Sequence, residues 1–314
     1  MSDGAKVWSL HLLVLVVVFA AQFLLPSYHM TNLARIMVLA VFAMGYNIAF
    51  GYTGLLSLGH ALFFAAGMYG MGLPIWHLEW LTLPALIAGL LAGGLMAGLI
   101  GVFALRTAGV SFMIVTLMFA QAGYLTLLYL NTWTGGDEGF VVARAARAVA
   151  GIDLAGDSAR YGAAFGLFAL ALLGCLWLVR SPFGRVMIGM RENEERSRML
   201  GYNPYKVKLT ALVLSGIYAG AAGAAYGILF GYVGATFATI QYSILPMLYV
   251  LLGGAGTVLG PFLGALVMFY LIDITSGFTG AYLFVVGAAL VAVVLFAPKG
   301  ILGTLREKVA PWLP

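Results

Sequence analysis

Long apolar runs separated by short polar segments follow one another along the whole chain. A transmembrane helix needs about 20 mostly apolar residues, and these runs have that character. The expected helices cover residues 7–25, 33–50, a stretch ending near 73, 81–105, 110–130, 161–179 and 209–230. After Gly234 the apolar runs 243–251, 258–272 and 279–297 supply an odd number of further passes. The pattern therefore predicts an all-α, polytopic integral membrane bundle of 8–10 transmembrane helices.

Glycine-rich stretches break the apolar pattern at residues 50–60 and 252–257. Irregular backbone at membrane depth persists only where protein buries it or where it lines a wet cavity. Both breaks are therefore candidates for a translocation path, and the polar side chains near them either bind a solute or satisfy the broken backbone. The candidate path residues are Asn47, Gly51, Gly54, Ser57, His60, Gln121, Gly253, Gly254 and Gly256.

The motif Phe-Gly-Tyr-x-Gly occurs twice, at residues 50–54 and 230–234, with a separation of 180 residues. Alternation of the predicted helices makes the two copies end helices that run in opposite directions. That arrangement is typical of the inverted repeats of transporters. Five residues rich in glycine also recur by coincidence, so the motif alone leaves both interpretations open.

The segment from Arg180 to Lys208 is the only strongly charged passage of its length in the sequence. It holds seven of the 16 basic residues and three of the 11 acidic residues, a local balance of +4. Short basic loops beside spanning helices stay in the cytoplasm, so this loop is predicted to be cytoplasmic. Consecutive spanning helices cross the membrane in opposite directions, and counting them outward from this loop places both termini in the cytoplasm. Residues 131–160 then form an external loop, which either meets an extracytoplasmic partner or is simply solvated.

The interior of this charged loop has the spacing of a helix over about residues 185–201. Three oppositely charged pairs at i and i+4 would each stabilise it by about 0.2–0.5 kcal/mol. The pairs are Arg191 with Glu195, Glu192 with Arg196, and Glu194 with Arg198. A less charged stripe consists of Val186, Met190, Ser197, Leu200 and Gly201, where the helix is expected to end. The helix is either a solvated segment that sets topology or a docking site for a cytoplasmic protein.

The composition agrees with a membrane protein. Hydrophobic residues make up 63% of the chain and charged residues 9%, whereas soluble proteins have roughly 25% charged residues. The mean hydropathy is +1.02. Glycine, with 42 residues, recurs at the spacing that lets helices pack closely in lipid. The spaced glycines are Gly94 with Gly98, Gly216 with Gly220, Gly223 with Gly227, and Gly256 with Gly260 and Gly264.

Several chemistries have no residues to support them in this sequence. No phosphate-binding Gly-x4-Gly-Lys-Ser/Thr motif, no Gly-x-Ser-x-Gly motif and no His-Glu-x-x-His motif occurs. Cys175 is the single cysteine, and the histidines lack metal-ligand spacing. No basic patch with interleaved aromatic residues indicates a nucleic-acid surface. The chain is therefore expected not to be an enzyme and to bind no metal, cofactor or nucleic acid. If ATP drives transport, a separate chain hydrolyses it.

Sequence blocks along nearly the whole chain carry a family resemblance. The blocks are GYTGLLSLGHALFFAAGMYG, RTAGVSFMIVTLMFAQ and TGGDEG, the loop sequences SPFGR, RENEE and LGYNPYKVKL, and then LLGGAGTVLGPFLGA and LFAPKGILG. Together they resemble the LivM-type permease subunit of bacterial branched-chain amino acid ABC importers. The resemblance implies one transmembrane permease domain over residues 1–314, in the bacterial inner membrane, for ATP-driven import of branched-chain, hydrophobic amino acids.

The same resemblance implies partners and a coupling site. The implied partners are a LivH-type second permease subunit, two cytoplasmic ATPase subunits that use ATP and Mg, an extracytoplasmic substrate-binding protein and membrane lipid. The loop over residues 180–208 is similar to the family's EAA motif, which contacts the ATPase subunit. Glu194, Glu195 and Gly201 match that motif, whereas Arg196 and Ser197 stand where it has two alanines. The residues expected to couple to the ATPase are Arg191, Glu192, Glu194, Glu195, Arg198 and Gly201.

Other functions stay open from the sequence. An importer of urea or short amides resembles the same blocks, and neighbouring genes or the specificity of the binding protein would distinguish it. A secondary transporter or channel working alone predicts transport without ATP, although intramembrane charges for ion coupling are scarce. A structural membrane scaffold predicts no solute flux.

Overall fold

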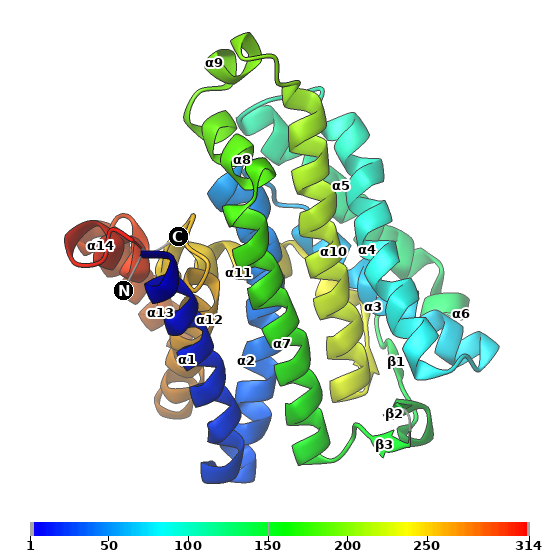
Figure 1. Ribbon diagram of the computed structural model, residues 1–314. Coiled ribbons are helices and arrows are strands. Elements are labelled where there is room, and N and C mark those ends of the chain that lie inside the picture. The colour runs from blue at the N-terminus through cyan, green and yellow to red at the C-terminus, as the bar shows by residue number, and fades with distance from the viewer. Residues whose placement is uncertain (1–2, 150, 313–314) are drawn as a thin grey trace.

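The computed structural model describes residues 3–149 and 151–312, which form a bundle of helices with two small strand pairs (Figure 1). The helices are α1 (Asp3–Leu24), α2 (Ser27–Asn47), α3 (His60–Leu78), α4 (Thr82–Ala104), α5 (Val110–Tyr129), α6 (Asn131–Thr134), α7 (Asp157–Arg180), α8 (Pro182–Glu192), α9 (Glu194–Met199), α10 (Pro204–Phe230), α11 (Ile240–Gly253), α12 (Gly260–Phe278), α13 (Tyr282–Phe296) and α14 (Gly300–Lys308). The shorter elements are the π-helix η1 (Ile48–Tyr52), the 3₁₀ helices η2 (Arg144–Arg147) and η3 (Ala235–Ala238), and the antiparallel pairs β1 (Phe140–Val141) with β4 (Tyr232–Val233) and β2 (Ala148–Val149) with β3 (Ile152–Asp153). The predicted all-α class is confirmed.

Eight helices of the described residues are long and apolar enough to cross a membrane. They are α1, α2 with η1, α3, α4, α5, α7, α10 and α12. Helix α11 and the central part of α13 are apolar but shorter. The predicted range of 8–10 passes therefore agrees with the structure, and the chain is a multi-pass membrane protein.

The start of the second helix differs from the sequence prediction. Residues 26–32 were expected to form a loop, but α2 begins at Ser27. Pro26 occupies the N-cap position with extended backbone (φ −60°, ψ 155°), and the chain becomes helical directly after it. The polar residues that follow therefore extend the apolar helix rather than precede it.

Glycine-lined contacts between α3, α4 and α10 form the centre of the bundle. A Cβ atom on Gly223 of α10 would lie 1.9 Å from the backbone oxygen of Phe64 on α3. A Cβ atom on Gly93 of α4 would lie 2.5 Å from the Cα atom of Gly220 on α10. Small residues allow such close backbone approach in lipid, where dispersion contacts drive helix association. The prediction of dense glycine packing is confirmed here, although Gly256 lies in a turn and not on a helix.

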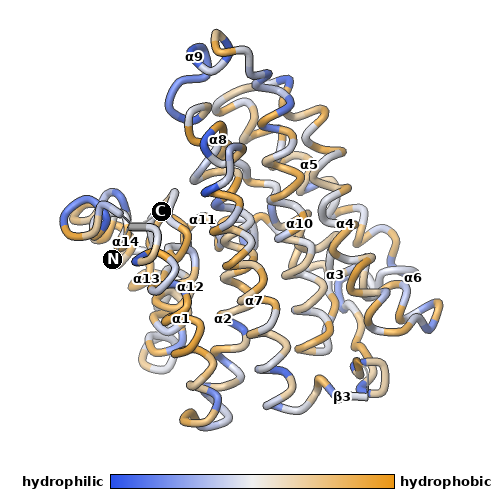
Figure 2. The backbone as a smooth tube through the Cα atoms, viewed as in Figure 1, coloured by the Kyte–Doolittle hydropathy of each residue, from blue (hydrophilic) through white to orange (hydrophobic). Residues whose placement is uncertain are grey.

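The peripheral helices present apolar surface outward. The spans of α1 and α5 are only 22% and 17% buried within the chain. Figure 2 shows hydrophobic residues along these helices, with hydrophilic residues gathered at α9, at α14 and near β3. This distribution is that of a bundle whose outer faces contact lipid or other apolar subunits.

Both described ends of the chain lie on the side of the bundle that carries α8. Gly4 near the start of α1 lies beside Arg180, the last residue of α7, two residues before α8 begins. Arg306 of α14 donates a hydrogen bond to the backbone oxygen of Gly256, next to Arg191 of α8. Helices α8 and α9 project at one end of the bundle, and α6 with the strands lies at the other end (Figure 1). The predicted co-location of the termini and the charged loop is therefore present in the structure.

The two Phe-Gly-Tyr-x-Gly motifs end antiparallel helices, as the sequence predicts. Helix α2 with η1 runs toward α8, whereas α10 starts after α9 and runs away from it (Figure 1). Helices α3 and α11 then begin at His60 and Ile240, a separation of 240 − 60 = 180 residues. Their first turns meet, because the backbone N–H of Ala61 donates to Ser243 Oγ at 3.0 Å. The internal correspondence therefore extends beyond the five-residue motif.

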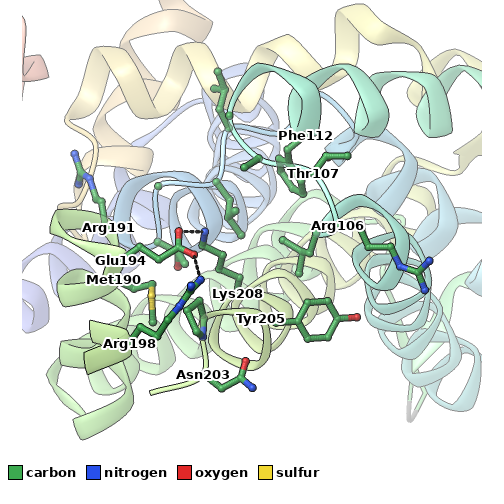
Figure 3. A pocket seen from close by; sticks show the side chains of 18 of the residues that line it. Arg106, Thr107, Phe112, Met190, Arg191, Glu194, Arg198, Asn203, Tyr205 and Lys208 are labelled. Carbon is green, nitrogen blue, oxygen red and sulfur yellow. Dashed lines mark hydrogen bonds and ion pairs between the residues drawn. The ribbon is translucent and has the colours of Figure 1, made fainter. Parts of the chain in front are cut away.

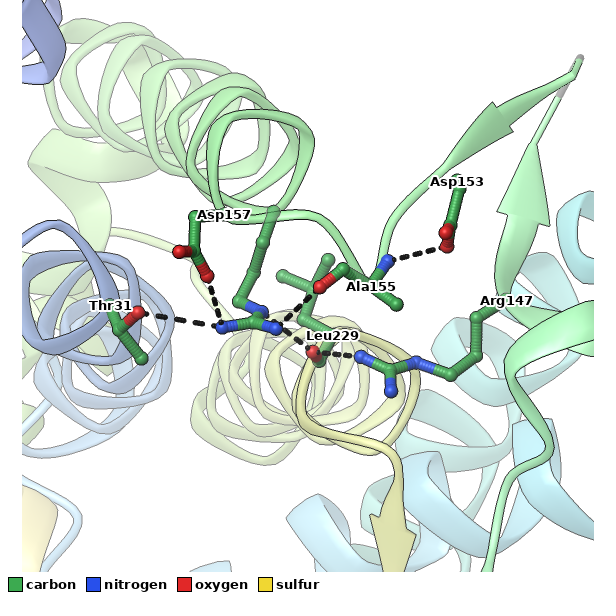
Figure 4. Close-up of polar contacts among 7 residues, drawn as sticks. Thr31, Arg147, Asp153, Ala155, Asp157 and Leu229 are labelled. Carbon is green, nitrogen blue, oxygen red and sulfur yellow. Dashed lines mark hydrogen bonds and ion pairs between the residues drawn. The ribbon is translucent and has the colours of Figure 1, made fainter. Parts of the chain in front are cut away.

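The loop over residues 131–160 is anchored to the end of α10 (Figure 4). Arg147 Nε donates to the backbone oxygen of Ile228 at 2.7 Å, and Arg160 Nε donates to that of Leu229 at 3.1 Å. Cations near the last carbonyls of a helix are stabilising because those oxygens lack partners within the helix. In the same loop the N–H of Ala155, and then the Arg144 guanidinium, hold the pKa of Asp153 below its usual range. The loop is therefore fixed against the end of α10, although many of its side chains are exposed.

Candidate functional site

Asn47 joins the two glycine-rich breaks. Its side-chain Nδ2 donates to the backbone oxygen of Thr257 at 2.9 Å, and its Oδ1 accepts from the backbone N–H of Gly256 at 3.0 Å. The side chain is fully buried. A Cβ atom on Gly51 would lie 1.8 Å from Asn47 Oδ1 and 2.6 Å from the nitrogen of Gly256, so only glycine fits there. We call the group formed by Asn47, Gly51, Gly256 and Thr257 the Asn47 junction. In it one side-chain amide pairs with the N–H of Gly256 and the oxygen of Thr257, which lie 209 and 210 residues away in sequence.

The charged loop reaches this junction through Arg191. Arg191 lies on α8, and its Nη1 donates to the backbone oxygen of Gly51 in the π-helix η1. A π-helical turn leaves backbone groups displaced from the regular helical ladder and is frequent at functional sites. Arg306 of α14 also reaches this junction and donates to the backbone oxygen of Gly256 at 3.2 Å. A hydrogen bond therefore links α8 directly to the break between α2 and α3.

The other predicted path residues lie in different surroundings. Ser57 and His60 are fully buried, Ser57 accepting from the N–H of Gly59 and His60 Nε2 lying 2.7 Å from Ser215 Oγ. These contacts bridge helices and satisfy broken backbone, which was the alternative to solute binding. Gln121 lies partly exposed on α5, and its side chain makes no hydrogen bond among the described residues.

The second break packs helices together. A Cβ atom on Gly253 would lie 1.8 Å from the backbone oxygen of Gly260, and one on Gly254 would lie 2.7 Å from the nitrogen of Gly303 on α14. Gly254 and Gly256 have positive φ of 125° and 75°, which turns the chain from α11 into α12. The structure thus brings Asn47, Gly51 and Gly256 together and gives Gly253 and Gly254 tight packing contacts.

A cavity of about 1040 Å³ lies between residues 53–56 after η1, the α4–α5 turn and the α8–α9 segment (Figure 3). The charged residues of its lining are mostly basic. Four cations contribute to it, and Glu194 is the acid among them. Glu194 lies 2.5 Å from Lys208 Nζ and 3.7 Å from Arg198 Nη2. The charged lining residues are Arg106, Arg191, Glu194, Arg198 and Lys208. The cavity therefore separates the end of α9 from the bundle, while the ion pair between Glu194 and Lys208 connects α9 to α10.

The prediction of one continuous helix over about residues 185–201 is wrong. The chain leaves helical geometry at Asn193 (φ −157°, ψ 103°), which divides it into α8 and α9. Asn193 Oδ1 accepts from the N–H of Arg196 at 2.8 Å, a helix N-cap. Asparagine favours this geometry because its side chain competes for nearby backbone donors. Of the three expected ion pairs only Glu194 with Arg198 forms, since the break separates the other two.

The loop's exposed apolar surface also differs from the predicted stripe. Met190 and Ser197 are 3% and 6% exposed and face the bundle. Met199 and Leu200, at the end of α9, are 84% and 72% exposed. Two adjacent exposed apolar side chains on an otherwise charged segment are a candidate contact surface, and methionine is enriched at interface centres. Sequence reasoning missed Met199, although an apolar pair beside Gly201 was a visible signal.

The remaining residues predicted to couple to the ATPase lie around the end of α9, the tip formed by Met199 and Leu200. Glu192, Glu195 and Arg198 are exposed, and Gly201, with φ +91°, ends the segment before α10. Ser197 is buried where the family motif has an alanine, so a small side chain is retained at that position. The α8–α9 segment therefore offers charged groups and two apolar side chains at its tip, and Arg191 at its base.

A multi-pass helical bundle with broken central helices and a projecting charged helix pair is the architecture of a membrane permease. Comparison with known families agrees: residues 29–295 match the family described as the permease component of branched-chain amino acid transport systems. Because this match covers most of the chain, the protein belongs to that family.

Curated relatives are similar over nearly the whole chain. The high-affinity branched-chain amino acid transport system permease protein LivM of Escherichia coli is 30% identical over 98% of this chain and 78% of its own length. The protein of the same name from Salmonella typhimurium is 28% identical over the same shares. The autoinducer 2 import system permease protein LsrC of Photorhabdus laumondii is 31% identical over 41% of this chain and 42% of its own. No solved structure matches the chain.

Proposed function

We propose that this chain is the permease subunit that conducts branched-chain amino acids through the bacterial inner membrane, driven by ATP hydrolysis on partner chains. Family membership over residues 29–295 and similarity to LivM over 98% of the chain support the substrate class. The chain opens alternately to each side as one permease domain over residues 1–314. It binds no cofactor of its own and performs no chemistry, and the partners use ATP and Mg.

The observation that carries the mechanism is the hydrogen bond from Arg191 to Gly51. Arg191 sits at the base of the projecting α8–α9 segment, and Gly51 sits in the π-helix at the Asn47 junction. An ATPase subunit that displaces α8 thereby moves the break between α2 and α3, and helix shifts of this kind convert a local push into a discrete rearrangement. The α8–α9 end and both termini are cytoplasmic in this proposal, consistent with the basic loop.

The proposed assembly contains a LivH-type permease subunit, two ATPase subunits and an extracytoplasmic substrate-binding protein. Membership in the permease component of a transport system supports such partners. The exposed tip, with Glu192, Glu195 and Met199, is the contact for the ATPase. The anchored loop over residues 131–160, at the opposite end, is the contact for the binding protein.

Reversal of charge at Glu195 tests the coupling role. Glu195 is exposed, whereas Glu194 pairs with Lys208 and Arg198, so Glu195→Lys alters the partner contact with less disturbance of the loop. In proteoliposomes holding the full transporter, Glu195→Lys should lower leucine uptake per ATP hydrolysed by about tenfold or more. The reversal places like charges opposite each other at the interface with the ATPase, which costs several kcal/mol. Glu79→Lys, an exposed acid at the other end of the bundle, is the control. Unchanged coupling in Glu195→Lys would reject the role.

The uptake assay also separates the alternatives. Each solute is tested with its cognate binding protein, and urea is compared with leucine. Leucine uptake that needs ATP supports the proposal. Uptake driven by an ion gradient without ATPase subunits indicates a secondary transporter, and uptake of urea in place of leucine indicates a short-amide importer.

A further inference from the structure

Arg35 is an arginine inside a membrane-spanning helix. It lies eight residues after the start of α2, which corresponds to about 12 Å along the helix axis. The span that contains it extends from Ser27 to Tyr52. A cation at this depth is costly, and such residues face a protein interior or water and mark solute paths.

The guanidinium of Arg35 has no carboxylate partner among the described residues. Its Nε atom is buried without a hydrogen bond, and the structure gives the side chain no ion pair. Its positively charged carbon lies 5.0 Å from the ring centroid of Phe230, a cation–π contact that holds the group from one side. The in-plane donors of the guanidinium thus have no hydrogen-bond partner within residues 3–149 and 151–312.

The neighbouring Arg160 is an arginine with a structural role in the same region, and its hydrogen bonds can be compared with those of Arg35. Its guanidinium is also near the Phe230 ring, at 5.9 Å, but its donors are occupied. The acceptors are Thr31 Oγ1, Asp157 Oδ1 and the backbone oxygens of Ala155 and Leu229 (Figure 4). Anchoring of the loop therefore accounts for Arg160 and not for Arg35.

Aromatic rings continue from Arg35 into the bundle. Phe230 lies 4.7 Å from Tyr226, Tyr226 lies 5.1 Å from Phe237, and Phe237 lies 5.0 Å from Tyr242, all between ring centroids. These four side chains are partly exposed. Tyr242 belongs to the first turn of α11, whose N-terminal N–H groups favour a nearby anion. An apolar wall thus stands beside an unpaired cation and a helix N-terminus, at the end of α10.

We propose that Arg35 binds the carboxylate of the transported solute, while the Tyr226, Phe230, Phe237 and Tyr242 rings contact its hydrophobic side chain. Guanidinium and carboxylate match in a planar, bidentate pair. The inference rests on the proposed function, because it assigns the carboxylate and side chain of a hydrophobic amino acid to one site. The site lies on the side of the bundle opposite α8, so it receives solute from the binding protein.

Uptake by the reconstituted full transporter tests the site. Arg35→Gln should lower the initial rate of L-leucine uptake by about tenfold or more, since a charge-assisted hydrogen bond carries on the order of that factor. Arg35→Lys keeps the charge but loses the planar guanidinium, so it should retain part of the wild-type uptake rate. Lys308→Gln removes an exposed cation from α14, outside both the proposed site and the 131–160 loop, and should match the wild-type rate. Wild-type uptake in Arg35→Gln overturns the inference alone, whereas absence of leucine uptake by the wild type overturns the proposed function.

Cysteine labelling measures binding without transport. In a Cys175→Ala background, Phe237→Cys places the single thiol beside the site. L-leucine should slow its reaction with a maleimide, and isoamylamine, which has the same side chain and amine without a carboxylate, should not. Equal protection by both compounds overturns the inference, even if Arg35→Gln fails to fold.

A lipid phosphate is the other oxyanion that Arg35 could bind. Repeating both assays in liposomes without anionic lipid and in liposomes with it separates the two sources. Leucine protection that is independent of the lipid supports the solute. An Arg35→Gln effect that disappears when anionic lipid is omitted assigns the arginine to lipid and overturns the inference.

Discussion

Gly223→Ala should prevent the bundle from packing. A Cβ atom at this position would lie 1.9 Å from the backbone oxygen of Phe64 and 3.1 Å from the nitrogen of Met68. Both contacts are with backbone, so no side-chain rotation relieves them, and α10 must move away from α3. Overpacking costs about 1–3 kcal/mol and occasionally more, and a backbone contact this short places Gly223 at the upper end. Size-exclusion chromatography after heating in detergent should show a large loss of monodisperse protein.

Gly166→Ala is the matched control for this loss. Gly166 lies in α7, also a membrane-spanning helix, and a Cβ atom there meets no atom within 4 Å. Alanine is favoured over glycine in a helix interior by about 0.8–1.0 kcal/mol, so this variant should be at least as heat-stable as the wild type. Equal stability of the two variants would show that α10 and α3 do not approach as closely as described.

Arg191→Ala should disconnect ATP hydrolysis from transport. The substitution removes the hydrogen bond from α8 to the Gly51 oxygen and leaves the exposed tip of α9 intact. A hydrogen bond to a charged group contributes about 1.5–3 kcal/mol, which corresponds to a fall of about tenfold or more in leucine uptake per ATP hydrolysed. The ATPase subunits should still bind. Uptake and hydrolysis measured together on the same proteoliposomes give the ratio.

Arg185→Ala serves as the comparison for Arg191→Ala. Arg185 is an exposed arginine on the same helix α8, and its side chain makes no hydrogen bond among the described residues. It should keep the wild-type ratio of transport to hydrolysis. If both variants lose coupling equally, the charge of α8 is responsible, and the link to Gly51 has no special role.

Helix positions could be predicted from the sequence because lipid imposes a length on apolar segments. The predicted helix over 110–130 corresponds to α5, and the predicted helix over 81–105 corresponds to α4. Counting the spanning helices also predicted correctly that the two Phe-Gly-Tyr-x-Gly motifs end helices running in opposite directions. Errors occurred at ends set by single side chains, such as Pro26, where capping rather than hydropathy determines the boundary.

The charged loop was harder to predict because its contacts are distant in sequence. Spacing at i and i+4 pairs Arg191 with Glu195, but Arg191 binds an oxygen 140 residues away. Local spacing also gave no weight to Asn193 as a cap, which divides the helix. Pairing rules describe isolated helices, whereas a buried backbone acceptor competes more strongly for the same guanidinium.

The candidate site was only partly visible in the sequence. Asn47 and Gly51 could be selected because they flank a glycine-rich break, and the structure joins them to Gly256. Gly253 could not be distinguished from them, since close packing and a wet path both favour glycine. Arg35 was missed although an arginine within a predicted transmembrane helix was a clear signal.

Side-specific labelling of the α9 tip tests the central claim most directly. A Leu200→Cys variant in the Cys175→Ala background carries one thiol at a position that is 72% exposed. A membrane-impermeant maleimide should label it in inside-out vesicles, and bound ATPase subunits should protect it. Labelling from the outer side of intact cells, or labelling in inside-out vesicles that the ATPase subunits leave unchanged, would contradict the account.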